Sequence, residues 1–254
     1  MPQIFRDIPQ RSKDWFALRR GRICSSHVGD LVDSDGNLKR GRSKGDSIGQ
    51  GVRSYVAQLV SERISGYIEL DTFSSAAMEY GVQHEAAARA ALEFQTGLTF
   101  VNVGGCLSDC GRWWASADGI ATETDGAVWA VAEIKIPLPK SQVKYLLDSK
   151  ELMDEYEPQL YHEMLVTQAQ AGYLFSYGPG LSARRVNVLC EVSADDPFIE
   201  NLRASLERVD ELVREALRSI GASETLPPVA MPEPAKSDRE WFAENFGTPT
   251  EAAR

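Results

Sequence analysis

The sequence predicts a mixed α/β fold (α+β) in which a central mixed β-sheet is flanked by helices. Three patterns support this fold class. Apolar side chains recur at every second position in residues 127–137, as expected of a strand with a buried face. In residues 196–220 apolar side chains recur at the spacing of an amphipathic helix. Helical segments come before, between and after the strand-like ones, and this order favours helices packed around one sheet.

Helical patterns fill most of the first hundred residues. Ser12 is suited to cap a short helix, because its hydroxyl can accept a hydrogen bond from a free backbone N–H. A stretch rich in Gly, Ser and charge then indicates a loop. The expected elements are a helical turn within 11–22 that breaks at Gly21, a short helix from Ser25 or Ser26, a loop over 33–51, a helix over 47–66 and a helix over 74–98 that ends at Gly97.

Strands and helices alternate in the remainder of the chain, where Gly- and Asp-rich turns separate the strand-like segments. The expected strands cover 99–105, 112–123, 127–137, 171–178 and 183–193, and the expected helices cover 140–150, 155–171 and 196–220. Together these elements predict one folded domain over residues 1–221. Residues 222–254 are expected to form a Pro-rich linker and a short C-terminal helix.

Composition argues against several classes of protein. The 254 residues are 43% hydrophobic and 25% charged, which is ordinary for a globular protein of this length. No apolar run is long enough to span a membrane and the N-terminus lacks a signal-peptide core, so a cytoplasmic protein is expected. Cys106 and Cys110 lie four residues apart without a second pair, which disfavours a zinc site and favours reduced thiols.

Charge is unevenly distributed along the chain. The net charge is -10, yet residues 1–60 contain 11 Lys and Arg against 6 Asp and Glu. The basic residues concentrate in 11–22 and 38–46, where they either face nucleic-acid phosphates or form an ordinary solvated loop. The candidate DNA contacts of the second cluster are Lys39, Arg40, Arg42 and Lys44.

One strand places charges in an apolar setting. Its apolar face consists of Val128, Ala130, Ala132, Ile134 and Ile136. The opposite face carries Glu133 and Lys135. Burying a carboxylate and an ammonium is costly unless the two charges pair or hold a ligand. Two structural explanations therefore stand beside a functional one: an edge strand whose polar face meets water, or a simple ion pair.

Asp118 adds a second carboxylate to this strand. Fourteen residues lie between Asp118 and Glu133, a spacing that suits a hairpin with the two carboxylates close together. Gly119 allows the chain to turn sharply next to Asp118. Carboxylate oxygens are the ligands that Mg²⁺ prefers, and Lys135 is suited to orient water or to offset charge on a phosphate. This group of residues indicates metal-assisted hydrolysis of a phosphodiester.

Asp118 followed by Glu133-Ile134-Lys135 resembles the motif of the PD-(D/E)xK nuclease superfamily, with Ala117 in place of the usual proline. Further motifs resemble the phage λ exonuclease and YqaJ-like viral recombinase family. They are a W-x-x-L-R-x-G-x-I-x-x-S pattern in 14–32, a G-x-x-x-E helix in 79–98, SADGI at 116–120, EIKIP at 133–137 and YEPQLYHEML at 156–165. The resemblance covers about residues 11–220 and implies a restriction-endonuclease-like core.

The resemblance implies a metal site. Its ligands to one or two Mg²⁺ ions, or to Mn²⁺ as a substitute, would be Glu85, Asp118, Glu133 and the carbonyl of Ile134. Lys135 would hold the attacking water, and Gln159 would position that water or the scissile phosphate. Judged without the resemblance, Glu85 is a glutamate on a helix surface and Gln159 a polar residue of an amphipathic helix.

The resemblance also implies that Arg19, Ser26 and Ser116 bind a 5′-terminal phosphate. This is chemically reasonable, because guanidinium offers a bidentate fork to phosphate and hydroxyls donate further hydrogen bonds. The structural alternatives are an ion pair of Arg19 with Asp14 or Asp30, and a helix cap for Ser26. The three histidines, His27, His84 and His162, align with none of the family's ligands.

The function that the resemblance implies is a Mg²⁺-dependent exonuclease. It would degrade the 5′-ended strand of linear duplex DNA and leave a 3′ overhang for recombination. A homotrimeric ring around the DNA, a single-strand annealing protein as partner, and a phage or prophage origin in a bacterial host are further implications. Two alternatives stay open: a PD-(D/E)xK endonuclease of the junction-resolving or restriction type, and a non-catalytic DNA-binding protein that keeps the fold.

Overall fold

The computed structural model describes residues 1–41, 47–68, 76–183 and 186–226. The helices are α1 (Lys13–Arg19), the 3-10 turn η1 (Ser25–His27), α2 (Val28–Leu31), α3 (Gln50–Ser65), α4 (Ala76–Thr96), α5 (Pro139–Leu147), α6 (Ser149–Thr167) and α7 (Pro197–Ser219). The strands are β1 (Gln3–Phe5), β2 (Ile23–Cys24), β3 (Gly105–Leu107), β4 (Trp113–Ala115), β5 (Gly119–Thr122), β6 (Val128–Lys135), β7 (Ala171–Ser176) and β8 (Val188–Ser193).

The predicted mixed α/β class is confirmed, but the strands of the described residues form two four-stranded sheets instead of one. One sheet has the order β1-β3-β4-β2 and the other the order β5-β6-β7-β8. Each sheet is mixed: β2 is parallel to β4 in the first, β6 is parallel to β7 in the second, and the remaining pairs are antiparallel.

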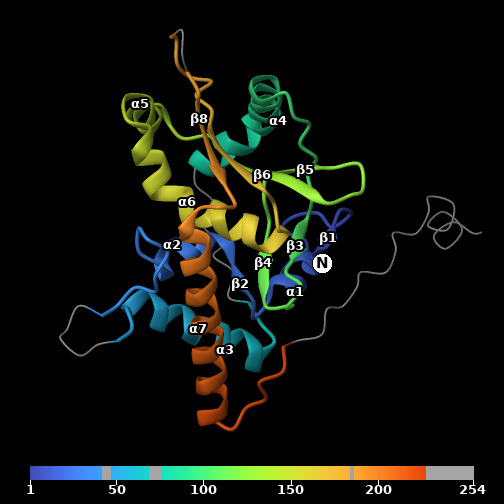
Figure 1. The fold of residues 1–254 in the computed structure, drawn as a ribbon, viewed down its shortest axis with the longest axis vertical. Coiled ribbons are helices and arrows are strands. Elements are labelled where there is room, and N and C mark those ends of the chain that lie inside the picture. Colours follow the sequence, from blue (N-terminus) through green and yellow to red (C-terminus); the bar gives the residue numbers. More distant parts are fainter. Residues whose placement is uncertain (42–46, 69–75, 184–185, 227–254) are drawn as a thin grey trace, which may run out of the picture.

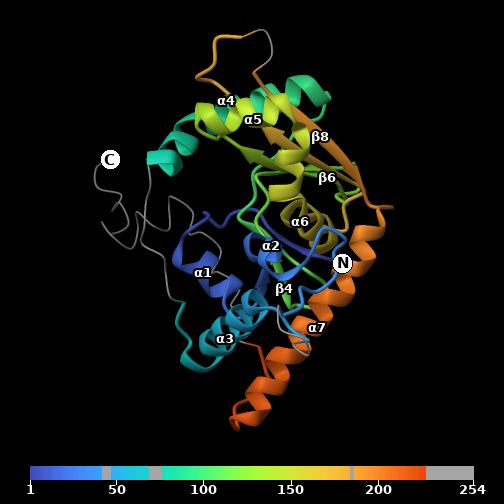
Figure 2. The ribbon, with the colours of Figure 1, turned by 90° about the vertical axis from the view of Figure 1, so that its left-hand side faces the viewer.

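Helix α6 lies between the two sheets. It contacts β6, β7 and β8 of one sheet and β3 and β4 of the other, and Figures 1 and 2 both show it crossing the middle of the molecule. Helix α4 contacts the opposite face of the β5–β8 sheet, where Ala88 and Leu92 pack with Phe175. The β5–β8 sheet is therefore covered on both faces, and its α6 face points into the centre of the protein.

The side-chain alternation predicted for β6 is confirmed with one exception. Ala130, Ala132 and Ile134 pack in the apolar cluster beneath α4, and Val131 packs on the α6 side. Val128 was expected with the first group but packs with the second. The register between β5 and β6 shifts at Ala121 and Thr122, directly opposite this end of β6, so Val128 leaves the regular alternation.

Three boundaries differ from the prediction. The expected strand 99–105 contributes only an isolated bridge at Val101, and β3 begins at Gly105. The expected strand 112–123 is two strands, because the chain passes from one sheet to the other at 116–118. Helix α6 begins at Ser149, ahead of the expected residue 155, because Asp148 caps it by accepting a hydrogen bond from the Lys150 N–H.

Several helix ends follow the sequence signals. The Ser12 hydroxyl accepts a hydrogen bond from the Trp15 N–H at the start of α1. Gly66 and Gly97, which follow α3 and α4, have φ angles of 68° and 71°, a conformation that glycine adopts without strain. Ser25 and Ser26 lie inside η1, whose N-cap is Cys24, so the predicted serine cap is wrong.

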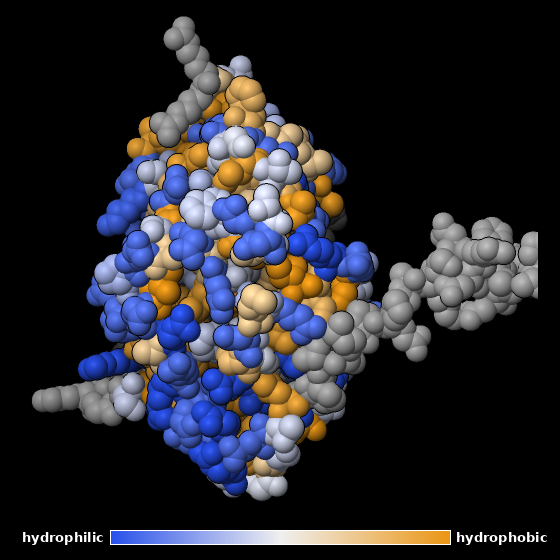
Figure 3. All heavy atoms as spheres, turned by 45° about the vertical axis from the view of Figure 1, so that its right-hand side comes forward, coloured by the Kyte–Doolittle hydropathy of each residue, from blue (hydrophilic) through white to orange (hydrophobic). Residues whose placement is uncertain are grey.

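Helix α7 packs along α3 and α6 and then projects from the body of the protein (Figures 1 and 2). Hydrophilic residues dominate the lower end of the face in Figure 3, where α7 projects. Surface ion pairs such as Arg208 with Glu215, at 2.9 Å, and Arg218 with Glu211, at 2.8 Å, account for its polar side. Its buried Asp210 lies 3.4 Å from Arg63 and 3.2 Å from Arg214.

Parts of the prediction fall outside the described residues, namely Arg42 and Lys44 of the basic cluster and residues 227–254 of the expected linker and terminal helix. Cys24 and Cys106 are free and buried. Among the described helices, none combines the length and apolar character that a membrane span requires.

Candidate active site

The β5–β6 hairpin brings Asp118 and Glu133 together as its spacing predicts. Gly119 pairs with Ala132, so Asp118 stands beside Glu133 at the start of the hairpin. Asp118 Oδ2 accepts a hydrogen bond from the Ile134 N–H at 2.7 Å. This bond fixes the carboxylate against the backbone of β6, between its two charged residues.

Glu133 and Lys135 occupy the α6 face of β6. The Glu133 side chain is 5% exposed, and its Oε1 lies 2.5 Å from Lys135 Nζ. The ion pair considered as a structural explanation therefore exists. It is not an edge-strand pair in water, because β6 lies between β5 and β7.

Helix α6 supplies the other wall. Tyr156, Gln159 and Glu163 follow one another at helical spacing on its inner side. Lys135 Nζ donates to Gln159 Oε1 at 3.3 Å and lies 4.1 Å from the centre of the Tyr156 ring. Gln159 Nε2 donates to Glu163 Oε1 at 3.1 Å. A chain of contacts thus runs from Glu133 through Lys135 and Gln159 to Glu163.

The carboxyl groups of Asp118, Glu133 and Glu163 outnumber the single ammonium group of Lys135 in this region. Burial, with Glu133 as a neighbour, raises the pKa of Asp118 to about 8. Burial also raises the pKa of Glu163 well above its ordinary value, and the charge of Glu133 adds to the effect. Burial disfavours the Lys135 ammonium, but the surrounding carboxylates, Glu133 first among them, outweigh it and raise the pKa of Lys135.

The donor chemistry fits a hard divalent cation. Glu133 Oε2 and Glu163 Oε2 are buried without a hydrogen-bond partner, and carboxylate oxygens in this state are suited to a cation. Within the described part of the chain, however, no group of three or more His, Cys, Asp or Glu residues converges closely enough to form a metal site. The predicted ligand set is therefore only partly assembled.

Glu85 is the predicted ligand that stands apart. It lies on α4, its side chain is 44% exposed, and it pairs with Arg89 at 3.1 Å. It lines a hollow of about 630 Å³ together with Asp118, and its charge contributes to the raised pKa of Asp118. Glu85 thus lines a different hollow from Glu133, and Asp118 belongs to both.

A second cavity, of about 280 Å³, brings the predicted phosphate ligands to the carboxylates. Its wall includes Asp118, Glu133 and Gln159 as well as Arg19, Ser26 and Ser116. The predicted catalytic and phosphate-binding residues come from segments far apart in the sequence. Their presence around one cavity is the main observation that links them.

The three phosphate candidates differ in what they can offer. The Arg19 guanidinium lies over the Trp15 ring at 4.5 Å, and the described residues show no ion pair between Arg19 and Asp14 or Asp30. Ser26 is exposed. Ser116 Oγ donates to the Gly104 carbonyl at 3.2 Å and accepts from two indole N–H groups, so its hydrogen bonds are internal.

Three residues of this region were missed by sequence reasoning. Ser25 and His162 form a buried hydrogen bond of 2.9 Å between Oγ and Nδ1. Glu163 lies fully buried at the cavity wall. The position of Glu163 four residues after Gln159 is a signal for it, because i and i+4 share a helix face. Ser25 and His162 are 137 residues apart, and no local pattern connects them.

The family is decided by sequence comparison. Residues 14–170 match the model of the YqaJ-like viral recombinase domain. The chain belongs to this family. The resemblance predicted from the motifs is thereby confirmed. Comparison with curated protein sequences gave no match.

Solved structures share the fold of this recombinase domain. An alkaline exonuclease from Laribacter hongkongensis (LHK-Exo) has a TM-score of 0.68 at 22% identity, covering 83% of this chain and 96% of that one. Its complex with dAMP has a TM-score of 0.65 at 22% identity, covering 83% and 98%. A phage-related exonuclease from Haemophilus somnus 129PT has a TM-score of 0.58 at 11% identity, covering 78% and 96%. Family and fold support a nuclease or recombination role.

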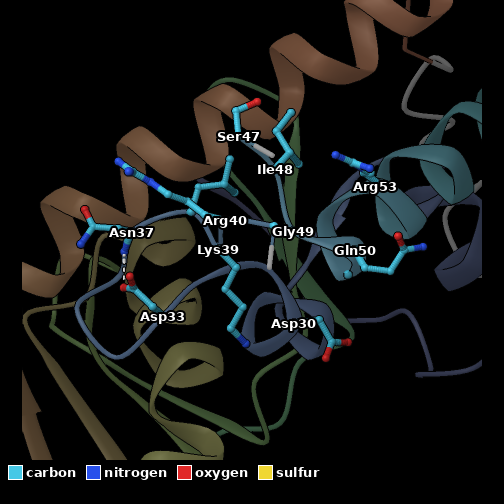
Figure 4. Close-up of a pocket in the computed structure, with 13 residues that line it drawn as sticks. Asp30, Asp33, Asn37, Lys39, Arg40, Ser47, Ile48, Gly49, Gln50 and Arg53 are labelled. Carbon is cyan, nitrogen blue, oxygen red and sulfur yellow. Dashed lines mark hydrogen bonds between the residues drawn. The ribbon is translucent and has the colours of Figure 1, made fainter. Parts of the chain in front are cut away.

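Lys39 and Arg40 of the basic cluster line a separate hollow of about 1260 Å³ (Figure 4). Lys39 and Arg40 point in different directions there, and Lys39 Nζ donates to the Gly29 carbonyl at 2.6 Å. Asp30 and Asp33 line the same hollow, so the described part of its wall carries both signs of charge.

The buried His162 predicts a pH-dependent stability of the recombinase domain. Burial lowers the pKa of His162 to about 3 from 6.5, so the folded protein keeps it neutral while the unfolded chain protonates it below pH 6.5. Its contribution to stability is complete above pH 6.5 and is lost as the pH falls toward 3. Between pH 7 and 4.5 this loss is about 2–3 kcal/mol.

His162→Asn removes the titration and keeps an acceptor for the Ser25 hydroxyl. We expect the variant to be less stable than the parent at pH 7, and this deficit to shrink by about 2–3 kcal/mol at pH 4.5. Urea denaturation at pH 7 and at pH 4.5 measures this difference in the free energy of unfolding. Ser25→Ala, which leaves the imidazole in place, serves as the control and should show a similar deficit at both pH values. A constant deficit for His162→Asn would contradict the assignment.

Proposed function

We propose that this protein is a Mg²⁺-dependent exonuclease. It degrades the 5′-ended strand of linear duplex DNA and leaves 3′ single-stranded overhangs for recombination by single-strand annealing. The observation that carries this proposal is the joint placement of Asp118, Glu133 and Gln159 with Arg19 around one cavity. Lys135 is held behind this wall by its contacts with Glu133 and Gln159. Hydrolytic groups and a group suited to a terminal phosphate lie within the same small space.

The residues of the chain divide the chemistry among them. Lys135 offers an ammonium that can hold a water molecule or offset charge on the phosphate, and the Glu133 carboxylate holds Lys135 in place. The Gln159 amide contacts Lys135 and can position the water or the scissile phosphate. Glu85, Asp118, Glu133 and the Ile134 carbonyl would hold one or two Mg²⁺ ions, or Mn²⁺ as a substitute, and the bound ion would supply Lewis-acid stabilisation of the phosphate charge.

Arg19 is the proposed anchor for a 5′-terminal phosphate. Stacking over Trp15 holds its guanidinium at the cavity wall, and the planar fork is suited to a bidentate phosphate contact. Ser26 is exposed and able to add a hydroxyl. Ser116 is proposed as a second hydroxyl, which requires one of its internal hydrogen bonds to open.

The structural neighbours are consistent with this proposal. The similar structures are those of exonucleases, and one was solved with dAMP, a nucleoside monophosphate such as an exonuclease releases. The cavity of about 280 Å³ is of a size for one terminal nucleotide and not for continuous duplex. DNA contacts from the basic cluster around Lys39, Arg40, Arg42 and Lys44 belong to the same proposal.

We further propose a homotrimeric ring that surrounds the DNA, an annealing protein as partner, and a place in the cytoplasm of a bacterial host as a phage or prophage protein. These points follow from the family alone. Light scattering is expected to give three times the mass of one chain. A mass of one chain at working concentrations would contradict the ring.

The function is tested with linear duplex DNA labelled separately at each end. With Mg²⁺ we expect loss of the 5′ label as mononucleotides, retention of the 3′ label until late, and no cleavage without a divalent ion. Lys135→Ala should lower kcat roughly 100-fold or more, because the charge beside the phosphate is lost. Digestion of covalently closed circles would point to the endonuclease alternative, and absence of any cleavage to the non-catalytic one.

Arg19→Ala tests the phosphate anchor. A hydrogen bond to a charged group is worth about 1.5–3 kcal/mol, so the variant should lose a preference of roughly tenfold or more for 5′-phosphorylated over 5′-hydroxyl ends. Binding to duplex without such an end should change much less. Arg20→Ala is the matched control, because Arg20 bonds to the Gly66 carbonyl instead of lining the cavity. Equal slowing of both end types by Arg19→Ala would refute the assignment.

A further inference from the structure

Glu163 is a buried carboxyl group without a cation of its own. Its residue is 0% exposed, and none of the ion pairs among the described residues includes it. Oε1 accepts one hydrogen bond, from Gln159, and Oε2 has no partner. A buried acidic group with so few partners destabilises a fold, and a role outside folding is the natural reason for its presence.

The backbone of α6 does not need this carboxyl group. The local bond at this position runs from the Thr167 hydroxyl to the Glu163 carbonyl, at 2.7 Å, and any side chain at 163 allows it. The apolar neighbours Leu160 and Met164 are already fully buried on α6. A leucine at this position would meet the demands of packing at least as well as a glutamate.

The contact with Gln159 has a direction that follows from chemistry. An amide has two ends of similar size, and only the carbonyl end can accept the hydrogen bond from Lys135. In the structure Glu163 Oε1 accepts the hydrogen bond from the NH₂ end of the amide, at 3.1 Å. Glu163 on one side and Lys135 on the other therefore select the same orientation, with Gln159 Oε1 toward Lys135 and Nε2 toward Glu163.

We propose that Glu163 is a positioning residue that fixes the orientation of the Gln159 amide and, through it, the place of the Lys135 ammonium. This inference rests on the proposed nuclease function. Without Glu163 the NH₂ end of the amide loses its hydrogen bond, and the contact with Lys135 alone favours this orientation. The amide then reverses more often, and in its reversed orientation the NH₂ group faces Lys135. The ammonium then loses one of its two fixed polar contacts, and only the bond to Glu133 remains.

The test uses Glu163→Leu and the isosteric Glu163→Gln in the full chain. We expect kcat to fall roughly 10- to 100-fold in the leucine variant, and less in the glutamine variant, whose carbonyl can still accept from Gln159. KM for duplex ends should stay within about twofold, because the residue does not contact DNA. Thermal melting should rise in both variants, since an unpaired buried acid is removed.

Glu157→Gln is the matched control. Glu157 is a partly buried glutamate of α6 that is absent from the cavity wall, and burial together with Asp196 raises its pKa. Its change should leave kcat unaltered. A glutamate that serves only the fold would lower the melting temperature when it is replaced, so a rise in melting temperature together with a loss of kcat separates positioning from structure.

A double-variant cycle with Gln159→Ala decides whether Glu163 acts through the amide. If it does, Glu163→Leu causes no further loss of kcat once Gln159 is alanine. Three results would each overturn the inference. They are kcat losses of the two single variants that multiply in the double variant, an unchanged kcat in Glu163→Leu, and a raised Mg²⁺ requirement without coupling between the two residues. A parent protein that cleaves no DNA would sink the proposed function instead, and the two failures are thus told apart.

Discussion

The candidate site depends on the imbalance between buried carboxylates and a single ammonium. Elsewhere the protein surrounds a buried acid with several cations: Asp210 has Arg63, Arg112 and Arg214 within 3.5 Å. Lys135 alone faces the carboxylates of the site, and two of their oxygens have no hydrogen-bond partner. Such an arrangement stores unfavourable free energy in the folded protein, and perturbed acids of this kind concentrate at functional sites. The same fold therefore contains a carboxylate group built for stability and one built for chemistry.

The division of the strands into two sheets makes this imbalance possible. Helix α6 fills the space between the sheets, so its inner side chains lie against β6 and near the crossing at 116–118 at the same time. Asp118 stands where the chain leaves one sheet for the other, with Ser116 two residues before it. Because the crossing is short, a residue suited to a terminal phosphate and a residue suited to a metal are held a fixed distance apart. The spacing of the cavity is thereby determined by backbone and not by flexible side chains.

Local signals in the sequence predict the helices and strands well. They predict poorly which residues of different elements contact one another. The alternation in β6, the Ser12 cap and the stop at Gly97 depend on neighbours within a few residues, so the sequence contains the information. The spacing from Asp118 to Glu133 predicts their approach for the same reason. Where the expected strand 112–123 breaks depends on which sheet each half joins, and that is a tertiary choice. Ser25 meets His162 only because η1 packs on α6, which no periodicity reveals.

The position of Glu85 shows how much of the predicted metal-ligand set is in place. Its hollow and the cavity lined by Glu133 share Asp118, so Asp118 is the one carboxylate that faces both. Glu85 pairs with Arg89 along α4. A metal cation that bound Glu85 would therefore compete with this ion pair. A single ion pair between residues four apart on a partly exposed helix is worth only about 0.3–0.5 kcal/mol. The interaction of Glu85 with a divalent cation beside Asp118 would be much more favourable in free energy, because the site is partly desolvated. The pairing with Arg89 is therefore a weak restraint on Glu85, and little free energy is lost when it breaks.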